Sequence, residues 1–312
     1  MSIIENFKKQ YKRSSLLMRF IYINIAVFVV LRLAGFVSFL FFGESTVLLQ
    51  WVELPSNFSV FLRHPWTLIT YMFSHYDVWH ILFNMLWLYW LGRIFLEFFN
   101  QRQLGGLYVL GGIGGAALYL TCFNLIPRLI TENGLLLGAS ASVLAIVIAT
   151  TIYRPDYRIS LLFFGRISLK WIALITVFID LIGTESGNLG GHIAHVGGML
   201  VGLWFGLSIK RGHDITLWIN RCIDWVVMLF KKGYSKVVSG LATDKKKSYK
   251  YHRSASSNSK SFNSSNSSNI NHSKGDDEAK LDEILIKLKQ SGYGALSDEE
   301  KEFLFNASRK RN

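Results

Sequence analysis

The amino-acid sequence predicts an all-α polytopic membrane protein, a bundle of six transmembrane helices with a cytoplasmic tail. Half of its 312 residues are hydrophobic, 14% are aromatic and the mean hydropathy is +0.27. This composition is too apolar for a soluble domain of that length. Six apolar stretches also have about the 20-residue length that crosses the hydrocarbon core of a bilayer. They lie at approximately 17–40, 78–99, 104–126, 135–153, 167–183 and 189–209.

Basic residues in the connections predict the orientation of these helices. Every second connection is rich in lysine and arginine, whereas the alternate connections carry only Arg63 and Arg128. Because positive residues gather on the cytoplasmic side of a membrane, both termini are expected in the cytoplasm. The expected location is a bacterial inner membrane. The formal net charge of +13 follows from this bias and from a basic tail. It favours the lipid bilayer, with its anionic headgroups, over nucleic acid as the partner.

Composition divides the chain into five segments. The segments are a basic cytoplasmic N-terminus (1–16), the six-helix membrane domain (17–209), an interfacial amphipathic helix with a basic segment (210–247), a disordered Ser/Asn-rich linker (248–275) and a small cytoplasmic helical hairpin (276–312). The first apolar stretch is too long for a signal peptide and lacks a small-residue cleavage site, so an anchor is expected. The tail is expected to be solubilising or regulatory.

Four polar side chains occur at one depth of otherwise apolar helices. With the N-terminus inside, the second, fourth and sixth helices all run inward from the external side. His80 and Asn84 begin the second helix, Ser140 is a few residues into the fourth, and His195 is about six residues, roughly 9 Å, into the sixth. Polar side chains are costly at membrane depth and often mark functional sites. We therefore expect these four groups to meet near the outer face.

Small residues predict which two helices approach most closely. Below Ser140, alanines recur every four residues, and below His195 glycines do the same. Such ridges let helix backbones approach each other in lipid, so the fourth and sixth helices are expected to bring Ser140 and His195 within reach. The two ridges are Ala141, Ala145 and Ala149 on the fourth helix, and Gly198, Gly202 and Gly206 on the sixth.

A serine beside a histidine indicates nucleophilic catalysis. A neutral imidazole takes the hydroxyl proton only transiently, so a Ser140–His195 pair is chemically sufficient without an acid. The reaction also needs donors for a tetrahedral oxyanion. His80 and Asn84 share one helix face and offer side-chain donors, and the backbone N–H of Ser140 lies in a first helical turn, where amides lack intrahelical partners.

Other interpretations of these residues remain open. A lone serine in a membrane helix often bonds the carbonyl four residues back, and a lone histidine is often a polar contact between helices. His192 and His195 could ligate a metal with His75 or His80, although no HExxH or carboxylate-rich pattern accompanies them. Asp180, near the outer end of the fifth helix, is expected to cap or pair at the headgroup level, with no catalytic role.

Three motifs resemble those of the rhomboid family of intramembrane serine proteases, and the resemblance covers roughly residues 15–209. Gly138-Ala139-Ser140-Ala141 is similar to the family's serine motif. The segment from Ala194-His195 to Gly198 and Gly202 resembles its histidine motif, and His80 with Asn84 matches its His-x-x-x-Asn motif.

The resemblance implies catalysis by Ser140 and His195, with oxyanion donors from the Ser140 N–H, His80 and Asn84. It implies cleavage of single-pass transmembrane protein substrates inside or just outside the bilayer, and it implies no metal or cofactor.

Three positions depart from the family pattern. The segment from Pro65-Trp66-Thr67 to Ser74-His75 resembles the end of the family's first external loop, but Thr67 stands where that loop usually has an arginine. Ala141 replaces the usual glycine after the nucleophile, and Leu144 stands where many members place an aromatic side chain against the histidine. The alternative function is therefore a pseudoprotease that binds membrane helices without cutting them. The enzyme is favoured because all four polar residues are present together. A transporter is disfavoured because the sequence lacks an inverted repeat of broken helices.

Overall fold

A computed structural model describes residues 13–46, 48–161, 165–182 and 188–229, together with residues 5, 10, 11, 283, 284, 297 and 299–303. The chain divides into two compact units, Met1–Ser239 and Gly240–Asn312. The expected linker at 248–275 lies outside the described residues, as does most of the expected hairpin at 276–312. The division into five segments therefore stays a prediction.

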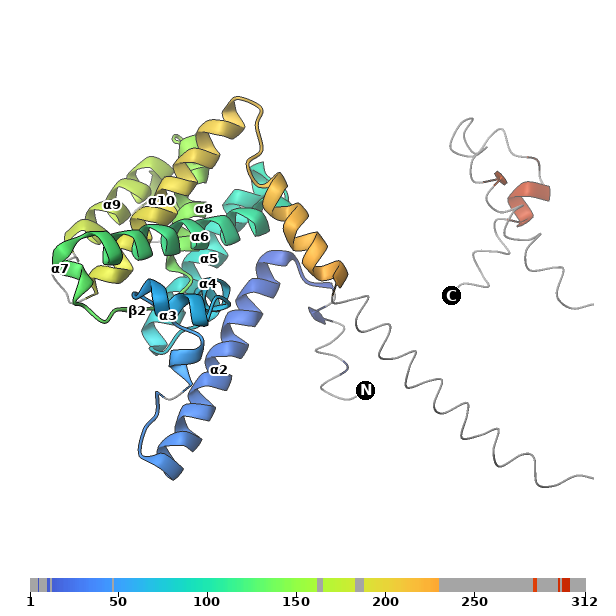
Figure 1. Ribbon diagram of the computed structural model, residues 1–312. Helices are drawn as coiled ribbons and strands as arrows, with labels where there is room; N and C mark the ends of the chain where they lie inside the picture. The colour runs from blue at the N-terminus through green and yellow to red at the C-terminus, as the bar shows by residue number, and fades with distance from the viewer. Residues whose placement is uncertain are drawn as a thin grey trace, which may run out of the picture. The chain divides into compact units, whose positions relative to one another are not determined.

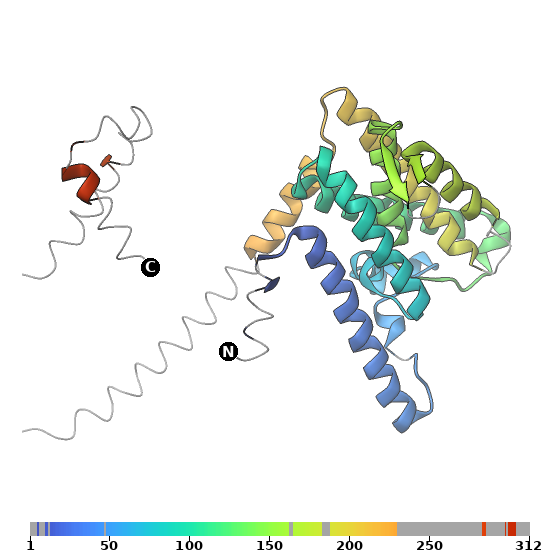
Figure 2. The same cartoon turned by 180° about the vertical axis from the view of Figure 1, so that it is seen from behind.

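The described part of the first unit contains six helices of 14 residues or more, which overlap the six apolar stretches (Figures 1 and 2). They are α2 (Leu16–Phe42), α5 (Val78–Phe98), α6 (Gln101–Leu125), α8 (Ser140–Tyr153), α9 (Leu169–Ile182) and α10 (Leu189–Lys210). Helices α2, α5, α6 and α10 are long and apolar enough to cross a membrane, and α8 is a shorter apolar helix. The protein is an all-α polytopic membrane protein, and the number of six crossings stays a prediction.

Short elements fill the connections between these helices. They are η1 (Leu49–Trp51), β1 (Leu54–Pro55), α3 (Phe58–Arg63), α4 (Thr67–Thr70), η2 (Tyr71–Phe73), α7 (Pro127–Ile130), β2 (Leu135–Leu136), β3 (Arg158–Leu161) and β4 (Gly165–Ser168). Strand β1 pairs antiparallel with β2, with Leu54 opposite Leu136. Strands β3 and β4 pair antiparallel between α8 and α9, with Arg158 opposite Ser168.

The apolar stretch at 135–153 does not form a single helix. Its first residues form β2, and the chain then turns at Gly138, whose φ of +118° lies in a region that L side chains rarely adopt. Helix α8 begins only at Ser140. The expectation that Ser140 lies a few residues into its helix was therefore wrong, because hydropathy does not separate an apolar strand and turn from the apolar helix that follows.

Helix α8 lies at the centre of the bundle, in contact with α5, α6, α9 and α10 (Figure 1). Its closest neighbour is α10, because a Cβ added at Gly198 would overlap the backbone carbonyl of Ala141, and one at Gly202 would overlap the carbonyl of Ala145. The expected approach of the two small-residue ridges is thus present. Helix α6 closes a third side, where a Cβ at Gly111 would lie 2.5 Å from the Cβ of Ala145.

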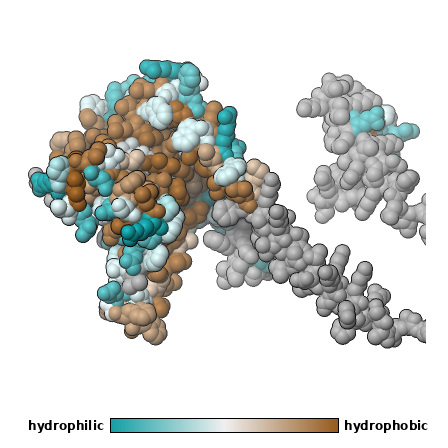
Figure 3. Space-filling view, in the orientation of Figure 1, coloured by the Kyte–Doolittle hydropathy of each residue, from teal (hydrophilic) through white to brown (hydrophobic). Residues whose placement is uncertain are grey.

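Much of the outer surface of the bundle is apolar, with hydrophilic patches between the apolar areas, as Figure 3 shows for one face. Helix α2 exposes a long row of apolar side chains, including Phe36 and Leu40, and α9 exposes Leu174 and Phe178. Surfaces of this kind are expected where helices face lipid rather than water.

After α10, residues 217–229 form a further helix. The Asn220 side chain donates to the backbone carbonyl of Arg102 over 3.0 Å, and the Arg102 guanidinium pairs with Asp224. These contacts fasten the helix to the start of α6. Trp218 and Trp225 are exposed on it, and its expected position in the membrane interface stays a prediction.

Candidate active site

The turn before α8 fixes where Ser140 lies. The N–H of Gly138 donates to the carbonyl of Tyr71 over 2.9 Å. A Cβ at Gly138 would lie 2.7 Å from the Cε1 atom of His80, so glycine is needed here for space as well as for its positive φ. The N–H of Ala139 donates over 3.3 Å to Nε2 of the fully buried His75. Burial lowers the pKa of His75 to about 3, so its ring stays neutral and accepts this bond.

The structure brings Ser140 and His195 together. The Oγ atom of Ser140, the first residue of α8, lies 2.7 Å from Nε2 of His195 on α10. The packing of Gly198 against Ala141, one helical turn below the histidine, sets this separation. A hydroxyl and an imidazole at this distance have the geometry of a nucleophile and its general base.

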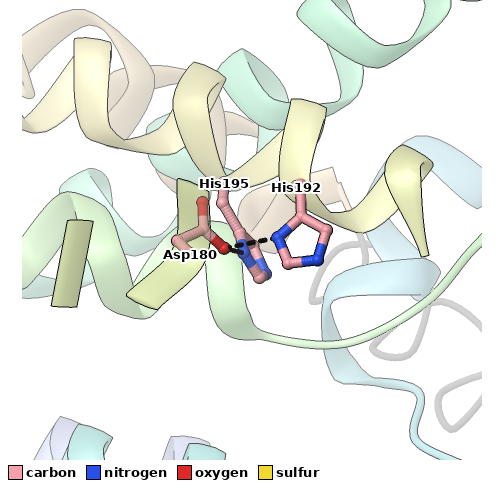
Figure 4. Close-up of side chains that lie close together, drawn as sticks. All are labelled: Asp180, His192 and His195. Carbon is pink, nitrogen blue, oxygen red and sulfur yellow. Dashed lines mark hydrogen bonds and ion pairs between the residues drawn. The ribbon is translucent and has the colours of Figure 1, made fainter. Parts of the chain in front are cut away.

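Asp180 is the residue that the sequence argument passed over. Its Oδ1 atom lies 2.6 Å from Nδ1 of His195 and 2.7 Å from Nδ1 of His192. Figure 4 shows the carboxylate of α9 pointing at both rings of α10. The Asp180 side chain is only 9% exposed, and the pairing that was expected for it is with these two histidines inside the bundle. The only indication of its role in the sequence was its position, because an acidic side chain at membrane depth needs a polar partner.

His80 and Asn84 lie on α5 and face the same cavity as Ser140 and His195. Asp77 caps α5 by accepting from the N–H of His80 over 2.9 Å. The Asn84 side-chain amide donates to the carbonyl of His80 over 2.9 Å, which occupies one of its two N–H groups. The second N–H and the His80 ring remain as candidate donors toward a substrate.

The cavity that joins these residues has a volume of about 620 Å³. Its walls come from α5, α8, α9 and α10, and most of them are apolar, including Trp79, Phe83, Leu144 and Ile179. An apolar wall with a few convergent polar groups is typical of a binding site. A substrate chain entering here would lose water around the reacting atoms, which strengthens electrostatic interactions.

A metal site formed with His75 or His80 does not match the geometry. Among the described residues, the group of side chains that could share an ion is Asp180, His192 and His195, whose ligand atoms lie within 4.8 Å of one another. The carboxylate oxygen of Asp180 and the Nδ1 atoms of the two histidines are already joined by hydrogen bonds.

The structure accommodates the three departures from the family pattern. Ala141 is 2% exposed and packs between α6 and α10. The Thr67 hydroxyl donates to the carbonyl of His64 over 2.6 Å, so it is satisfied locally. Leu144 is 8% exposed at the cavity wall and supplies an apolar surface near the polar residues.

Comparison with known proteins gives consistent matches. Residues 62–212 match the family model described as Rhomboid domain. The chain is 28% identical over 203 residues to RHOMBOID-like protein 12, mitochondrial, of Arabidopsis thaliana, which covers 61% of this chain and 60% of that protein. It is 28% identical over 152 residues to Presenilin-associated rhomboid-like protein A, mitochondrial, of Danio rerio, covering 48% and 38%.

A bacterial relative also matches. The chain is 27% identical over 191 residues to Rhomboid protease GlpG of Yersinia pseudotuberculosis, covering 60% of this chain and 63% of that protein. The chain thus spans between 38% and 63% of the length of these three relatives. Since two of them are named as mitochondrial and one is bacterial, the comparisons support an integral membrane protein without specifying the membrane.

Proposed function

The chain belongs to the rhomboid family, and on that premise we propose that it is a serine endopeptidase that cleaves transmembrane segments of single-pass membrane proteins. The observation that carries the proposal is the 2.7 Å separation of Ser140 Oγ and His195 Nε2 inside a cavity with largely apolar walls. A serine hydroxyl without a base is a weak nucleophile, whereas one bonded to a neutral imidazole can attack a carbonyl carbon.

In the proposed reaction, Nε2 of His195 takes the hydroxyl proton of Ser140 as Oγ attacks the scissile carbonyl. The N–H of Ser140, with His80 and Asn84, stabilises the resulting oxyanion, and the partial positive charge at the start of α8 adds to this. The imidazolium then protonates the leaving amine. Water attacks the acyl-enzyme with the same histidine as its base, which regenerates the serine.

The substrate must reach the serine as an extended chain. Backbone hydrogen bonds oppose the opening of a helix inside a bilayer, so preferred substrates should carry Gly or Pro near the outer end of their membrane helix and a small residue at the cut. Replacing those residues with Leu in a model substrate should suppress cleavage. Equal cleavage of both substrates would count against entry by local unwinding.

For location, we propose a bacterial inner membrane, as for a relative of bacterial origin, and the basic residues in alternate connections favour an orientation with both termini in the cytoplasm. Fusions of a reporter to each connection would test this arrangement.

The decisive test is covalent labelling of Ser140 with a fluorophosphonate probe. The purified protein should label at Ser140, and labelling should vanish in Ser140→Ala and in His195→Ala while thermal unfolding is unchanged, because the two residues act as one unit. EDTA should leave labelling intact. If the folded protein neither labels nor cuts any model substrate but still binds transmembrane segments, the pseudoprotease interpretation replaces the enzyme.

A further inference from the structure

The carboxylate of Asp180 completes a chain of hydrogen bonds behind the nucleophile. Ser140 lies at one ring nitrogen of His195, and Asp180 lies at the other, at 2.7 and 2.6 Å. The two partners come from different helices, α8 and α9, and the histidine from a third. We propose that Asp180 is a positioning residue, which holds His195 in the tautomer and orientation that proton transfer from Ser140 requires. This inference rests on the proposed function.

The chemistry of the two ring nitrogens supports the assignment. A carboxylate only accepts hydrogen bonds, so the contact with Oδ1 places a proton on Nδ1 of His195. In a neutral ring the other nitrogen, Nε2, then has its lone pair free and faces the Ser140 hydroxyl. The opposite tautomer would put a proton on Nε2 and leave the serine without a base.

The proton count during acylation is simple. The hydroxyl proton of Ser140 moves to Nε2 of His195, and the ring becomes an imidazolium. The proton on Nδ1 stays in place, and Asp180 remains a carboxylate that stabilises the new positive charge from 2.6 Å away. The Nε2 proton then passes to the leaving amine.

His192 secures the carboxylate in this arrangement. It lies one turn before His195 on the same helix, and its Nδ1 donates to the same oxygen over 2.7 Å. The Asp180 side chain is 9% exposed and the two imidazoles are 14% and 18% exposed. A largely desolvated carboxylate needs such donors, and two rings on one oxygen hold it more firmly than one.

The same contacts explain how α9 approaches the site. Only Leu169 and Ala173 are buried on this helix, and both lie near its start. At its other end, the hydrogen bonds of Asp180 tie α9 to α10. The carboxylate therefore both orients the base and holds its own helix against the cavity.

The test compares full-length variants on a model transmembrane substrate. Asp180→Asn keeps the size of the side chain but removes the charge and allows the wrong tautomer. We expect kcat to fall by roughly ten- to a thousandfold, with KM within about threefold of wild type, and labelling of Ser140 to slow in parallel. Asp180→Glu should recover part of the loss, and His192→Ala should give a smaller loss. Asp156→Asn, the same change at an exposed carboxylate, should match wild type.

A second measurement distinguishes a positioning role of Asp180 from a folding defect in the variant and from failure of the proposed function. Imidazole ¹⁵N shifts of His195 should report the Nδ1–H tautomer in the wild type and a mixture in Asp180→Asn, with the helical fold retained by circular dichroism. Wild-type kcat in Asp180→Asn, beside inactive Ser140→Ala, would overturn the positioning role and leave the protease intact. Loss of activity with EDTA would make the three residues a metal site instead. If the wild type fails to label, the ¹⁵N shifts alone still decide the role of Asp180.

Discussion

Helices α8 and α9 have the same length and opposite surroundings. Each has 14 residues, but ten are buried on α8 and two on α9. Helix α8 carries Ser140 and is enclosed by α5, α6 and α10, whereas α9 carries Asp180 and exposes most of its apolar side chains. The nucleophile therefore sits on the most enclosed helix of the bundle, and the carboxylate behind its base on one of the least.

Two kinds of constraint therefore act on the partners of His195. The position of Ser140 is set by backbone contacts that leave no room for an extra methyl group, as at Gly198. The position of Asp180 is set by hydrogen bonds to side chains. Substitutions at the small-residue contacts between α8 and α10 should thus act on the fold, while substitutions of the exposed side chains of α9 should have little effect.

The largest effect on stability and cleavage is expected where α8 packs against α10. Gly198→Val should destabilise the protein by about 1–3 kcal/mol and reduce cleavage by about a hundredfold or more, because its side chain would overlap the backbone of Ala141. Thermal unfolding in detergent and a cleavage assay would measure both. The matched control is Leu200→Val on the same helix, where the side chain is 54% exposed. A stable and active Gly198→Val would show that α8 can move relative to α10, and backbone contacts would then not fix the position of Ser140.

The next effect concerns α5, which faces Ser140 across the cavity. If Asn84 helps to stabilise the oxyanion, Asn84→Ala should lower kcat by roughly ten- to a thousandfold with little change in KM, because the lost bond forms mainly in the transition state. Steady-state kinetics would separate the two constants. Parallel losses in kcat, affinity and thermal stability would instead assign Asn84 to the fold through its bond to His80.

A smaller effect on stability is expected from a change of pH, through Glu53, which is buried directly before β1. Burial raises the pKa of Glu53 from 4.5 to about 7. The folded protein favours the protonated form, so this contribution to stability is complete below pH 4.5 and is lost as the pH rises to about 7.

The thermal unfolding temperature of the wild type should therefore decrease as the pH is raised from 5 to 8. The thermal unfolding temperature of Glu53→Gln should depend less on pH. The same pH dependence in both proteins would assign the effect to other groups.

The smallest effect is expected on the outward face of α9. Phe178 is 62% exposed, so Phe178→Leu should change stability by less than about 0.5 kcal/mol and leave cleavage within about twofold of wild type. The comparison would be sharpened if Asp180→Asn, two residues further along the same helix, were impaired under identical conditions. A large loss in Phe178→Leu would show that α9 is held by contacts beyond its polar end.

Much of the architecture could be predicted from the sequence because hydropathy and helical spacing are local properties. The apolar stretches locate the helices, and the ridges of Gly198, Gly202 and Ala145 indicate which two pack most closely. Approximate depth and these ridges together grouped Ser140 with His195, although the start of the helix that carries Ser140 was misplaced. These inferences need only the rise per residue and the side of the membrane from which each helix starts.

The rest depends on rotation and on distant partners. Depth places Asp180 near His195, but only the rotation of α9 about its axis decides whether the carboxylate faces the ring or the lipid. The pairing of Leu54 with Leu136 joins two loops far apart in the sequence, and no local periodicity predicts it. The turn at Gly138 is likewise fixed by the His80 ring from another helix.

The shortness of α8 and α9 has a consequence for the surrounding lipid. At 1.5 Å per residue, 14 residues span roughly 21 Å, whereas the hydrocarbon core of a bilayer is about 30 Å thick. For a crossing of the bilayer by α9, the acyl chains around it would have to compress to match its length, and the thickness of the bilayer would then act on the helix that carries Asp180. Turnover should then be higher in short-chain than in long-chain phosphatidylcholine vesicles, and an equal rate in both would show that the bundle shields α9 from this mismatch.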